Sequence, residues 1–512
     1  MDAESRFRDP SSLFFQFDTI RRYIIASYWV LITLALPLWW TTTSIERLPL
    51  PTSEVYAQAQ KKLEIPLAIC VDSAFSSHIT SLQRSIRDAA SYLDVQAHLG
   101  QDCSMCALYL NWSTCTDFPG YAILPGERIL VEDRKLYYPP SADNLASTLA
   151  SLLAPKMDHR AAQYSPRFRL SFTLLNEDSS AGQVITSWDI QQAIARHIHP
   201  ITSALGILHN YTIESQVQYH ALLAFEPRSL SNGTVFGLTP EDLTIFINSA
   251  EWTLSSSSSN DPVFHFVLFI PSARRRPLTI LNSDGTPSSS SAFLIPQWGG
   301  IVILNLPPPP PTTLHLDLPD LQSSFSSFSR HLLTLLGFPR LPPSISYSSS
   351  SNTSLSSWQI DTLLRQRIHE NVIQSHDTLQ STVTLVSQID GMPVDEQVQS
   401  QVQGSLSALH ELFRYASVNL TFAEMLAYSA QALTLSSTAF FHPGMLAMLY
   451  FPAEHKYAVY TPLFASAMIP LLAAALREIA AWRKERREAR AVGDVREATS
   501  GDGPKVGTKS VL

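Results

Sequence analysis

The run YIIASYWVLITLALPLWW, residues Tyr23–Trp40, decides the architecture because none of its 18 side chains is charged. As a helix it would be about 27 Å long, close to the hydrocarbon thickness of a thin bilayer. A cleaved signal peptide has an apolar stretch of about 7–15 residues followed by small residues, whereas this run ends in Trp39 and Trp40. A buried core helix is the other alternative. We expect a first transmembrane helix at 23–40.

A second uncharged run, AVYTPLFASAMIPLLAAAL at residues 458–476, predicts a second transmembrane helix. Pro462 and Pro470 lie inside it, and a proline inside a helix removes a backbone hydrogen bond. We therefore expect a kinked helix whose freed carbonyls are satisfied by neighbouring helices.

Basic side chains flank both runs. Arg21 and Arg22 precede the first run, and six more follow the second: Arg477, Arg483, Lys484, Arg486, Arg487 and Arg490. Because basic residues concentrate on the cytoplasmic side of membrane helices, both chain ends are predicted to be cytosolic and the long middle segment lumenal. Arg21 and Arg22 also lie where anionic lipid headgroups collect, so they are candidates for holding a phospholipid phosphate. The alternative is that they only set the orientation.

Composition excludes two classes of protein. The chain has 512 residues, of which 45% are hydrophobic and 16% charged, too apolar a composition for a disordered protein. Its net charge is −8, and residues 41–457 hold 23 basic and 34 acidic side chains. A nucleic-acid-binding protein needs a basic face, so we expect no nucleic acid among the partners.

The middle segment carries features typical of an oxidising, glycosylating compartment. Its five N-x-S/T triplets give the candidate glycosylation sites Asn111, Asn210, Asn232, Asn352 and Asn419. All four cysteines lie there within 46 residues: Cys70, Cys103, Cys106 and Cys115. An even number of cysteines predicts one or two disulfides, and all three full pairings remain open. The Cys103-x-x-Cys106 spacing also occurs in redox and zinc sites, but no second Cys or His pair accompanies it.

The hydrophobic periodicity changes along this segment. Between about residues 60 and 306, short apolar runs alternate with helical patterns, which favours an α/β layer. The expected strands are 65–71, 107–110, 128–132, 168–175, 211–224, 263–270 and 301–306, and the expected helices lie near 75–95, 141–153, 187–198 and 240–250. Five prolines at 307–311 form a stiff connector. Apolar residues spaced by three and four then predict helices over 320–337 and 356–440.

The predicted fold class is a membrane protein with two transmembrane helices flanking a large α/β lumenal domain with a C-terminal helical layer. The predicted divisions are a cytosolic N-terminus (1–22), transmembrane helix 1 (23–40), a lumenal α/β region (41–306), a Pro/Ser-rich connector with a short helix (307–355), a lumenal helical region (356–457), transmembrane helix 2 (458–476) and a basic cytosolic tail (477–512).

A search for catalytic motifs finds no G-x-S-x-G, H-E-x-x-H, P-loop or dinucleotide-binding pattern. Histidines cluster at 197, 199, 209 and 220, but such residues are more often packing or surface groups than metal ligands. Cys70 lies in an apolar strand, where burial makes a thiol inert. Asp317 and Asp320 could form a glycosidase-like pair but fit better as the exposed start of a helix. We expect no catalytic residue, metal or cofactor, which favours an assembly component over an enzyme.

Three segments are distinctive enough to indicate a family. They are LPLWWTT at residues 36–42, followed by Arg47-Leu48-Pro49; PQWGGI at 296–301, with Asn305 just after; and LYFPAEHKYAVY at 449–460. Together with the two-helix topology, they resemble the PIG-S family of glycosylphosphatidylinositol (GPI) transamidase subunits over about residues 20–480.

The resemblance implies a non-catalytic glycoprotein subunit of the endoplasmic reticulum membrane. Its complex cuts a hydrophobic C-terminal signal from a precursor protein and joins the new end to the ethanolamine of GPI. The implied partners are the other transamidase subunits, including a cysteine protease-like catalytic subunit, and membrane lipids. The alternatives are a stand-alone lumenal enzyme acting on GPI lipid or glycan, and a two-span cargo adaptor.

One family motif is a candidate contact surface. Trp298 stands beside Gly299 and Gly300 at the entry to an apolar strand. Because aromatic residues are enriched at interface hot spots, the three residues are candidates for contact with another subunit. The alternative is a tight turn packed on the core, with glycines that tolerate unusual backbone angles.

Overall fold

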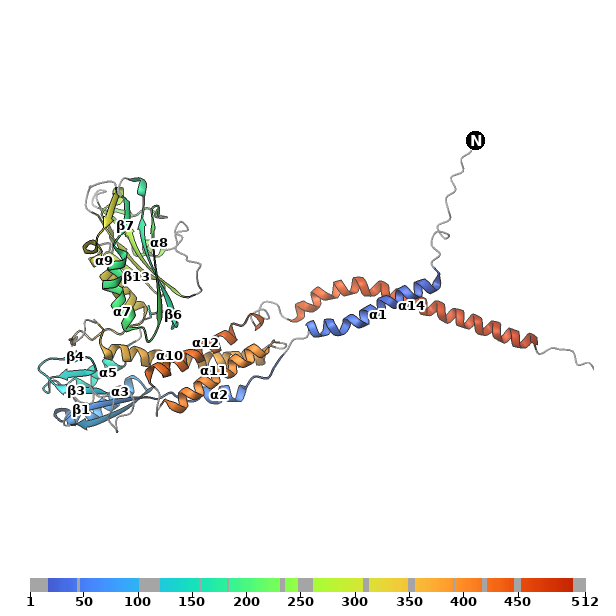
Figure 1. Cartoon of the computed structure of the whole chain (residues 1–512), viewed down its shortest axis with the longest axis horizontal. Helices are drawn as coiled ribbons and strands as arrows, with labels where there is room; N and C mark the ends of the chain where they lie inside the picture. Colours follow the sequence, from blue (N-terminus) through green and yellow to red (C-terminus); the bar gives the residue numbers. More distant parts are fainter. Residues whose placement is uncertain are drawn as a thin grey trace, which may run out of the picture. The chain divides into compact units, whose positions relative to one another are not determined.

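The computed structural model describes residues 17–43, 47–100, 120–156, 159–181, 184–230, 235–246, 261–306, 313–348, 355–389, 392–416, 421–445 and 453–500. The chain divides into two units, each described by itself (Figure 1). Unit 1 comprises residues 1–50, 384–399 and 440–512, and unit 2 comprises residues 51–383 and 400–439.

Unit 1 contains the two long apolar helices. Helix α1 runs over Asp18–Thr43 and helix α14 over Ala453–Ser500, and the two lie side by side (Figure 1). Most of their large apolar side chains are exposed. Within the described residues, these two helices are long and apolar enough to cross a membrane, over Thr19–Leu38 and Ala458–Val492.

The segment after α1 is fixed by backbone pairing within unit 1. Arg47 and Val394 form an isolated parallel bridge, and the Leu48 N–H donates to the Val394 carbonyl at 2.9 Å. The Arg47 guanidinium donates to the Val386 carbonyl at 2.7 Å. Arg47 and Leu48 of the family motif therefore fix the segment after α1 to Val386 and Val394.

The first sheet of unit 2 has six strands in the order β16-β4-β5-β3-β1-β2. Their bounds are β1 Ile65–Asp72, β2 Leu93–Gly100, β3 Tyr121–Pro125, β4 Leu130–Glu132, β5 Lys135–Tyr138 and β16 Ser346–Tyr347. Strand β1 pairs in parallel with β2 and β3, and alternates buried with half-buried residues. Helix α3 (Ile79–Ala89) packs on β2 and on α5 (Leu145–Leu153), burying Leu82 and Ile86, which lie one turn apart.

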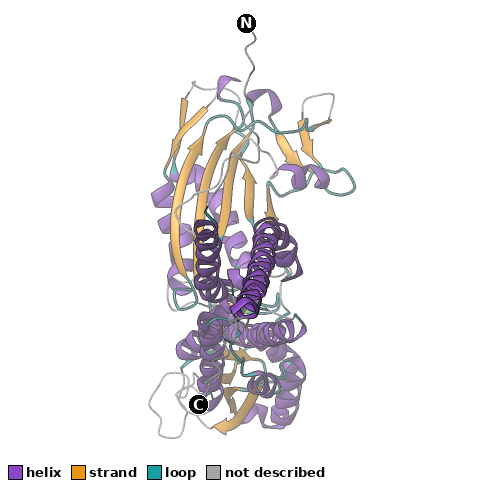
Figure 2. Cartoon of the chain, turned by 90° about the vertical axis from the view of Figure 1, so that its right-hand side faces the viewer, coloured by secondary structure: helices purple, strands orange, loops and turns teal. Residues whose placement is uncertain are grey.

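The second sheet has five strands in the order β13-β14-β11-β6-β8, and Figure 2 shows its strands running side by side. Their bounds are β6 Arg167–Asn176, β8 Asn210–Gln218, β11 Val263–Ile270, β13 Ala292–Ile295 and β14 Gly299–Ile303. Strands β6 and β11 are buried along almost their whole length, as central parallel strands covered on both faces are.

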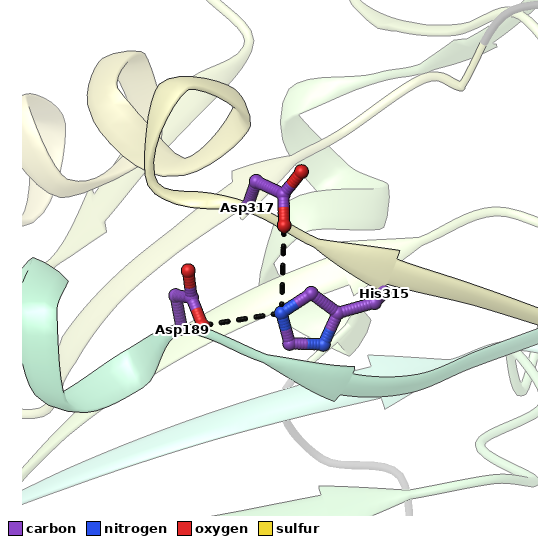
Figure 3. A group of neighbouring side chains, drawn as sticks. All are labelled: Asp189, His315 and Asp317. Carbon is purple, nitrogen blue, oxygen red and sulfur yellow. Dashed lines mark hydrogen bonds and ion pairs between the residues drawn. The ribbon is translucent and has the colours of Figure 1, made fainter.

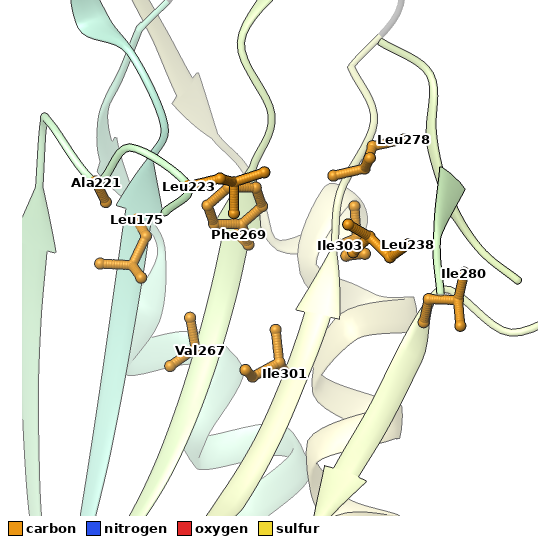
Figure 4. Packing of buried hydrophobic residues seen from close by; sticks show 10 residues of the cluster. All are labelled: Leu175, Ala221, Leu223, Leu238, Val267, Phe269, Leu278, Ile280, Ile301 and Ile303. Carbon is orange, nitrogen blue, oxygen red and sulfur yellow. The ribbon is translucent and has the colours of Figure 1, made fainter. Parts of the chain in front are cut away.

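Different layers cover the two faces of this sheet. On one face, Phe172 of β6 stacks on Phe325 of α9 (Leu318–Leu335) with ring centroids 5.6 Å apart. On the other face lies an apolar cluster (Figure 4): Leu175, Ala221, Leu223, Leu238, Val267, Phe269, Leu278, Ile280, Ile301 and Ile303. Burial of apolar surface at roughly 25 cal/mol per Å² makes these two layers the main source of stability for this half of the unit.

Smaller elements complete unit 2. One three-stranded sheet has the order β12-β10-β9, and a two-stranded sheet joins β15 to β7. The remaining bounds are α2 Thr52–Ala59, η2 Ser73–His78, η3 Ser179–Ala181, β7 Val184–Trp188, α6 Ile190–Ala193, η4 Ile194–Ile198, α7 His199–Ala204, β9 Arg228–Leu230, β10 Val235–Leu238, α8 Pro240–Phe246, η6 Ala273–Arg275, β12 Leu278–Ile280 and β15 Thr313–Leu316.

The C-terminal part of the fold is helical, as predicted. It contains α10 (Ser357–Gln388), α11 (Glu396–Tyr415) and α12 (Phe422–Phe440). The predicted apolar stripe of α10 is buried at Leu364, Ile368, Val372, Leu379 and Val383. Polar contacts add to the packing in unit 2: the Asn371 amide donates to Ser429 Oγ at 3.3 Å.

The structure corrects the sequence-based elements in three places. The helix expected to reach residue 95 ends at Ala89, and Leu93–Gly100 form β2 instead, because Leu93 and Val95 alternate with polar residues at the strand period. The strands of the single expected α/β layer are divided among four sheets, and β15 and β16, from beyond residue 306, pair with β7 and β4. The strand expected over 211–224 ends at Gln218, at the edge of its sheet. The strand expected at 107–110 lies outside the described residues.

Candidate functional site

Few of the expected modification sites lie in the described residues. Asn210 is the exposed first residue of β8. Cys70 lies at the middle of β1, half-buried between His98 of β2 and Ala122 of β3, and its side chain has a partner. The other candidates lie outside the described residues: Asn111, Asn232, Asn352, Asn419, Cys103, Cys106 and Cys115. Their modification and pairing stay predictions.

The Trp298-Gly299-Gly300 motif ends the turn between β13 and β14 with Trp298 and begins β14 with the two glycines. The half-buried Trp298 ring stacks on His265, with centroids 4.9 Å apart. A Cβ on Gly299 would lie 1.9 Å from the His265 carbonyl oxygen, and one on Gly300 would lie 2.1 Å from Nδ1 of His331. Close approach of backbone to strand β11 and helix α9 therefore requires both glycines. The motif packs on the core, and its use as a subunit contact stays a prediction.

Asn305, which follows β14 of the five-stranded sheet, joins that sheet to β12 of the three-stranded sheet. Its side-chain amide donates to the Leu278 carbonyl at 2.8 Å, and its carbonyl oxygen accepts the Leu278 N–H at 2.9 Å. The two bonds use both functional groups of the amide. Asn305 is a structural residue in the described fold.

Arg21 and Arg22, the candidates for lipid headgroups, contact carboxylates of α14. Arg22 Nε lies 2.6 Å from Glu478 Oε1, and its other end lies 2.9 Å from Glu485 Oε2. Arg21 lies 2.8 Å from Glu478 Oε2. The two guanidiniums thus hold the start of α1 beside the part of α14 that follows its apolar run. Binding of a lipid phosphate by these residues stays a prediction.

One group of side chains has the composition of a metal or catalytic site (Figure 3). His315 Nε2 lies 3.1 Å from Asp189 Oδ1 and 3.6 Å from Asp317 Oδ1. The other ring nitrogen, Nδ1, lies 2.7 Å from Ser187 Oγ. Two strands and the start of a helix supply these groups, since Ser187 is on β7, His315 on β15 and Asp317 precedes α9. Sequence reasoning missed the group because its members are about 130 residues apart in the chain.

The same geometry also has a purely structural explanation. Asp317 is the N-cap of α9, where it forms a capping box with Asp320, as the predicted role for these two residues requires. Asp317 is 72% exposed and His315 44% exposed. The positive end of α9 opposes a cation beside Asp317. The group therefore acts best as a hydrogen-bonded clamp that joins β15 to Ser187 and Asp189.

A second polar network is buried between the first sheet and α10. Asp361 accepts hydrogen bonds from Tyr121 Oη and from Arg134 Nε, both at 2.8 Å. Tyr121 Oη in turn accepts from the Arg365 guanidinium at 2.7 Å. Burial, the largest influence, raises the pKa of Tyr121, so the phenol stays protonated. The network is paired within unit 2 and acts as a structural anchor for α10.

A cavity of about 560 Å³ lies in unit 2 where α3, α5 and α9 end. Its lining includes three basic side chains, Lys156, Arg160 and Arg340. Gln366 of α10 also lines it, and among the described residues no aspartate or glutamate does. Sequence analysis did not find this site because its basic residues come from different loops.

The residues matched by a known family include all three motif segments. The chain matches the family described as "Phosphatidylinositol-glycan biosynthesis class S protein", PIG-S, over residues 26–113 and 133–485. The "GPI transamidase component PIG-S homolog" of Schizosaccharomyces pombe is 30% identical over 493 residues, covering 92% of this chain and 86% of that protein. The "GPI-anchor transamidase component PIGS" of Bos taurus is 28% identical over 514 residues, covering 86% and 92%. The "GPI transamidase component GPI17" of Saccharomyces cerevisiae is 28% identical over 316 residues, covering 59% and 56%. With a family match along most of its length and 30% identity to a named relative over 92% of the chain, the chain belongs to the PIG-S family.

Proposed function

We propose that this chain is a component of the GPI transamidase, the complex that attaches GPI anchors to the C-termini of precursor proteins. The observation that carries the proposal is the family match over residues 26–113 and 133–485, together with 30% identity to a named component over 92% of the chain. Purification of the tagged full-length chain in mild detergent, followed by mass spectrometry, tests it. We expect a stoichiometric set of subunits that includes a cysteine protease-like one. A chain recovered alone would contradict the proposal.

Within that complex, the chain is a non-catalytic subunit. This part of the proposal is supported by the structural roles found for the candidate groups: Asp317 caps a helix, and the Cys70 side chain is already engaged. Cys70→Ser is expected to lower the abundance of the chain rather than its activity per molecule. A variant that is abundant and assembled, yet inactive in GPI attachment, would overturn this assignment.

One contact favours the alternative of a lumenal hydrolase. Ser187, His315 and Asp189 form a chain of contacts of 2.7 and 3.1 Å, which has the residue types of a serine hydrolase triad. The order of the ring nitrogens is reversed relative to that template, because the serine contacts Nδ1 and the carboxylate Nε2. Ser187→Ala separates the two functions: loss of a triad serine costs a hydrolase about 10³-fold or more in rate, whereas GPI attachment is expected to be unchanged.

The proposed location is the endoplasmic reticulum membrane, with α1 and α14 as the two spans and both termini cytosolic. The ion pairs of Arg21 and Arg22 with Glu478 and Glu485 support this topology, since they hold the outer ends of both apolar runs together. Protease added to sealed microsomes is expected to remove a tag placed after residue 500 and to spare the segment between the helices. A protected C-terminal tag would overturn the orientation.

The lumenal segment is a disulfide-containing glycoprotein in this proposal. Exposure of Asn210 supports glycosylation there, and assignment of Cys70 as a bonded rather than free thiol supports a disulfide with one of the other three cysteines. Glycosidase treatment of the native protein is expected to increase its gel mobility, and Asn210→Gln to remove one glycan. An unshifted band would contradict glycosylation.

The predicted contacts of the membrane end and of the Trp298 turn are part of the same proposal. Arg22→Lys keeps the charge but loses the planar donor pair, and Arg22→Gln loses both. If the guanidinium also holds a lipid phosphate, both variants are expected to reduce the anionic lipid that co-purifies; equal recovery leaves only the contacts with Glu478 and Glu485.

For Trp298, replacement by Phe keeps the stack on His265, so a loss of co-purifying subunits without a loss of stability would identify a contact surface.

A further inference from the structure

The cavity of about 560 Å³ in unit 2 has a size and a charge that suit a small anionic ligand. Pockets for small molecules typically measure about 300–1,000 Å³. The walls come from the ends of three helices and from the loops that follow them, including Ala154, Pro155 and Phe338, with Gln366 of α10. The polar side chains of the lining, including Ser151 and Gln366, would contact hydroxyls of a ligand, and the basic side chains would contact its charge.

Backbone carbonyls at these helix ends are already paired, so they do not make the cavity a cation site. At the end of α9, the Leu335 carbonyl accepts the Ala162 N–H at 2.8 Å, and the Leu336 carbonyl accepts from Arg367 at 2.9 Å. After α5, the Pro155 carbonyl accepts from Gln366 at 3.1 Å. Paired carbonyls have little remaining attraction for a positive charge.

The basic side chains, by contrast, have donors to spare. Lys156 and Arg340 are exposed, and neither forms an ion pair with a carboxylate in the described part of the chain. Arg340 makes one long hydrogen bond, 3.4 Å to Thr334 Oγ1, which leaves most of its five N–H groups available. Arg160 has another interaction within the chain, which leaves Lys156 and Arg340 as the two basic side chains available to a ligand.

We propose that this cavity binds a phosphorylated polyol, with Lys156 and Arg340 on the phosphate and the cavity walls around the ring. A guanidinium binds two phosphate oxygens through paired N–H bonds, and an ammonium adds a point charge. Residues 41–457 hold more acidic than basic side chains, so two basic side chains without a carboxylate partner among the described residues are unusual in this chain. The inference rests on the proposed function for its ligand, because GPI carries an inositol phosphate.

Calorimetric titration of the purified full-length chain in detergent tests the proposal, with myo-inositol 1-phosphate as the probe. Myo-inositol and inorganic phosphate, titrated in parallel, distinguish the ring from the charge. Saturable binding of the probe, weaker binding of phosphate alone and none of inositol are the expected results. The double variant Lys156→Gln/Arg340→Gln is expected to weaken binding about tenfold or more, as the loss of charge-assisted hydrogen bonds does.

Two further variants keep the result specific. Lys62→Gln removes an exposed charge outside the cavity and is expected to leave affinity unchanged. Ala154→Phe keeps every charge but fills the cavity, so it is expected to weaken the inositol phosphate more than inorganic phosphate. Unchanged affinity in the double variant overturns the proposal, as does equal weakening by Lys62→Gln, which would indicate surface charge only.

The intact complex separates this inference from the proposed function. If the double variant binds the probe normally but loses co-purifying subunits, the cavity is a contact for an acidic segment of a partner and the ligand proposal is wrong. If subunits co-purify normally and probe binding is lost, the proposal is supported whether or not GPI attachment changes. A chain that binds the probe but has no transamidase partners would contradict the proposed function alone.

Discussion

Single atoms decide the local structure around the family motif at 298–300. A glycine in a motif is usually explained by the wide range of backbone angles that it tolerates, and the sequence interpretation of Gly299 and Gly300 used that reason. The structure gives another: His265 and His331 lie where their Cβ atoms would be. Trp298 then covers His265. A glycine pair beside an aromatic residue can therefore be recognised in the sequence. The atoms for which the two glycines make room belong to His265 and His331, each about 30 residues away in the chain, and the sequence does not show that they lie there.

Gly299→Ala is expected to destabilise the chain by about 1–3 kcal/mol, since the added methyl meets a backbone carbonyl that cannot rotate away. Urea unfolding of the purified chain measures the loss. Gly404→Ala in α11 is the matched control, because its Cβ would meet only the Leu435 side chain, at 3.0 Å. Equal stability of the two variants would contradict the close-approach argument.

Buried histidines make stability depend on pH. Burial lowers the pKa of His209, His265 and His331 to about 4 from an ordinary value of 6.5. Above pH 6.5 these histidines are neutral in both the folded and the unfolded chain. Between pH 6.5 and about 4 they gain a proton in the unfolded chain but stay neutral in the folded chain. Stability is therefore expected to fall by about 1.4 kcal/mol per pH unit for each histidine in that window.

Thermal unfolding at about pH 7.5 and about pH 5 checks this expectation, with the lower pH giving the lower midpoint. His209→Phe, at the least exposed of these sites, is expected to reduce the difference between the two midpoints. His98→Phe, at an exposed position on β2, is expected to leave the difference unchanged. A midpoint that does not move with pH would show that these histidines are accessible to protons in the folded chain.

At the scale of elements, α10 is anchored by polar contacts as well as by its apolar stripe. Asp361 and Arg365 lie one turn apart on α10 and reach Tyr121 of β3, while Arg134 contacts Asp361 from just before β5. Partners separated by 227 to 244 residues hold the helix against the first sheet. A buried network of this kind fixes one orientation of the helix, because any other leaves charges unpaired.

Asp361→Asn is expected to destabilise the chain by about 2 kcal/mol or more, since it leaves the buried Tyr121 hydroxyl and the Arg134 guanidinium without their carboxylate. Chemical unfolding measures the difference. Asp377→Asn, the same change at an exposed position of α10, is the control and is expected to have little effect. If the two variants have the same free energy of unfolding, an amide at residue 361 replaces the carboxylate fully and the network argument is wrong.

Elements with a strong local signal could be predicted, and elements that depend on distant partners could not. The apolar runs of β1, β6 and β11 and the stripe of α10 were recognised from periodicity alone. The two- and four-residue strands β16 and β15 have too few residues for a period, and they exist because β4 and β7 pair with them. The network at Asp361 and the cavity beside Lys156 were missed for the same reason: each collects residues from segments far apart in the chain.

At the scale of the whole molecule, the first and last helices of the described chain meet through charges. Arg22 contacts both Glu478 and Glu485, and Arg21 shares Glu478. Exposed ion pairs contribute only about 0–1 kcal/mol each in water, but three of them at one place form a network whose geometry excludes other pairings. The network gives the two apolar helices a defined partner in each other.

Charge reversal tests this pairing. Arg22→Glu places three carboxylates together and is expected to lower the cellular abundance of the chain several-fold. Adding Glu478→Arg restores opposite charges and is expected to recover much of the loss, whereas adding Glu488→Arg, at a carboxylate that contacts only Lys484 in the described contacts, is not. Quantitative immunoblotting measures all three variants. Equal rescue by both second changes would mean that net charge, rather than the specific pair, matters.

The contact between α1 and α14 also orders events in time. A ribosome makes Arg22 456 residues before Glu478 and 463 residues before Glu485. The two arginines therefore have no carboxylate from α14 until the ribosome has made that helix. A chain that stops before α14 keeps both arginines without these carboxylates beside an unpaired apolar helix, so a quality-control machinery that recognises this combination distinguishes such a chain from one that includes α14.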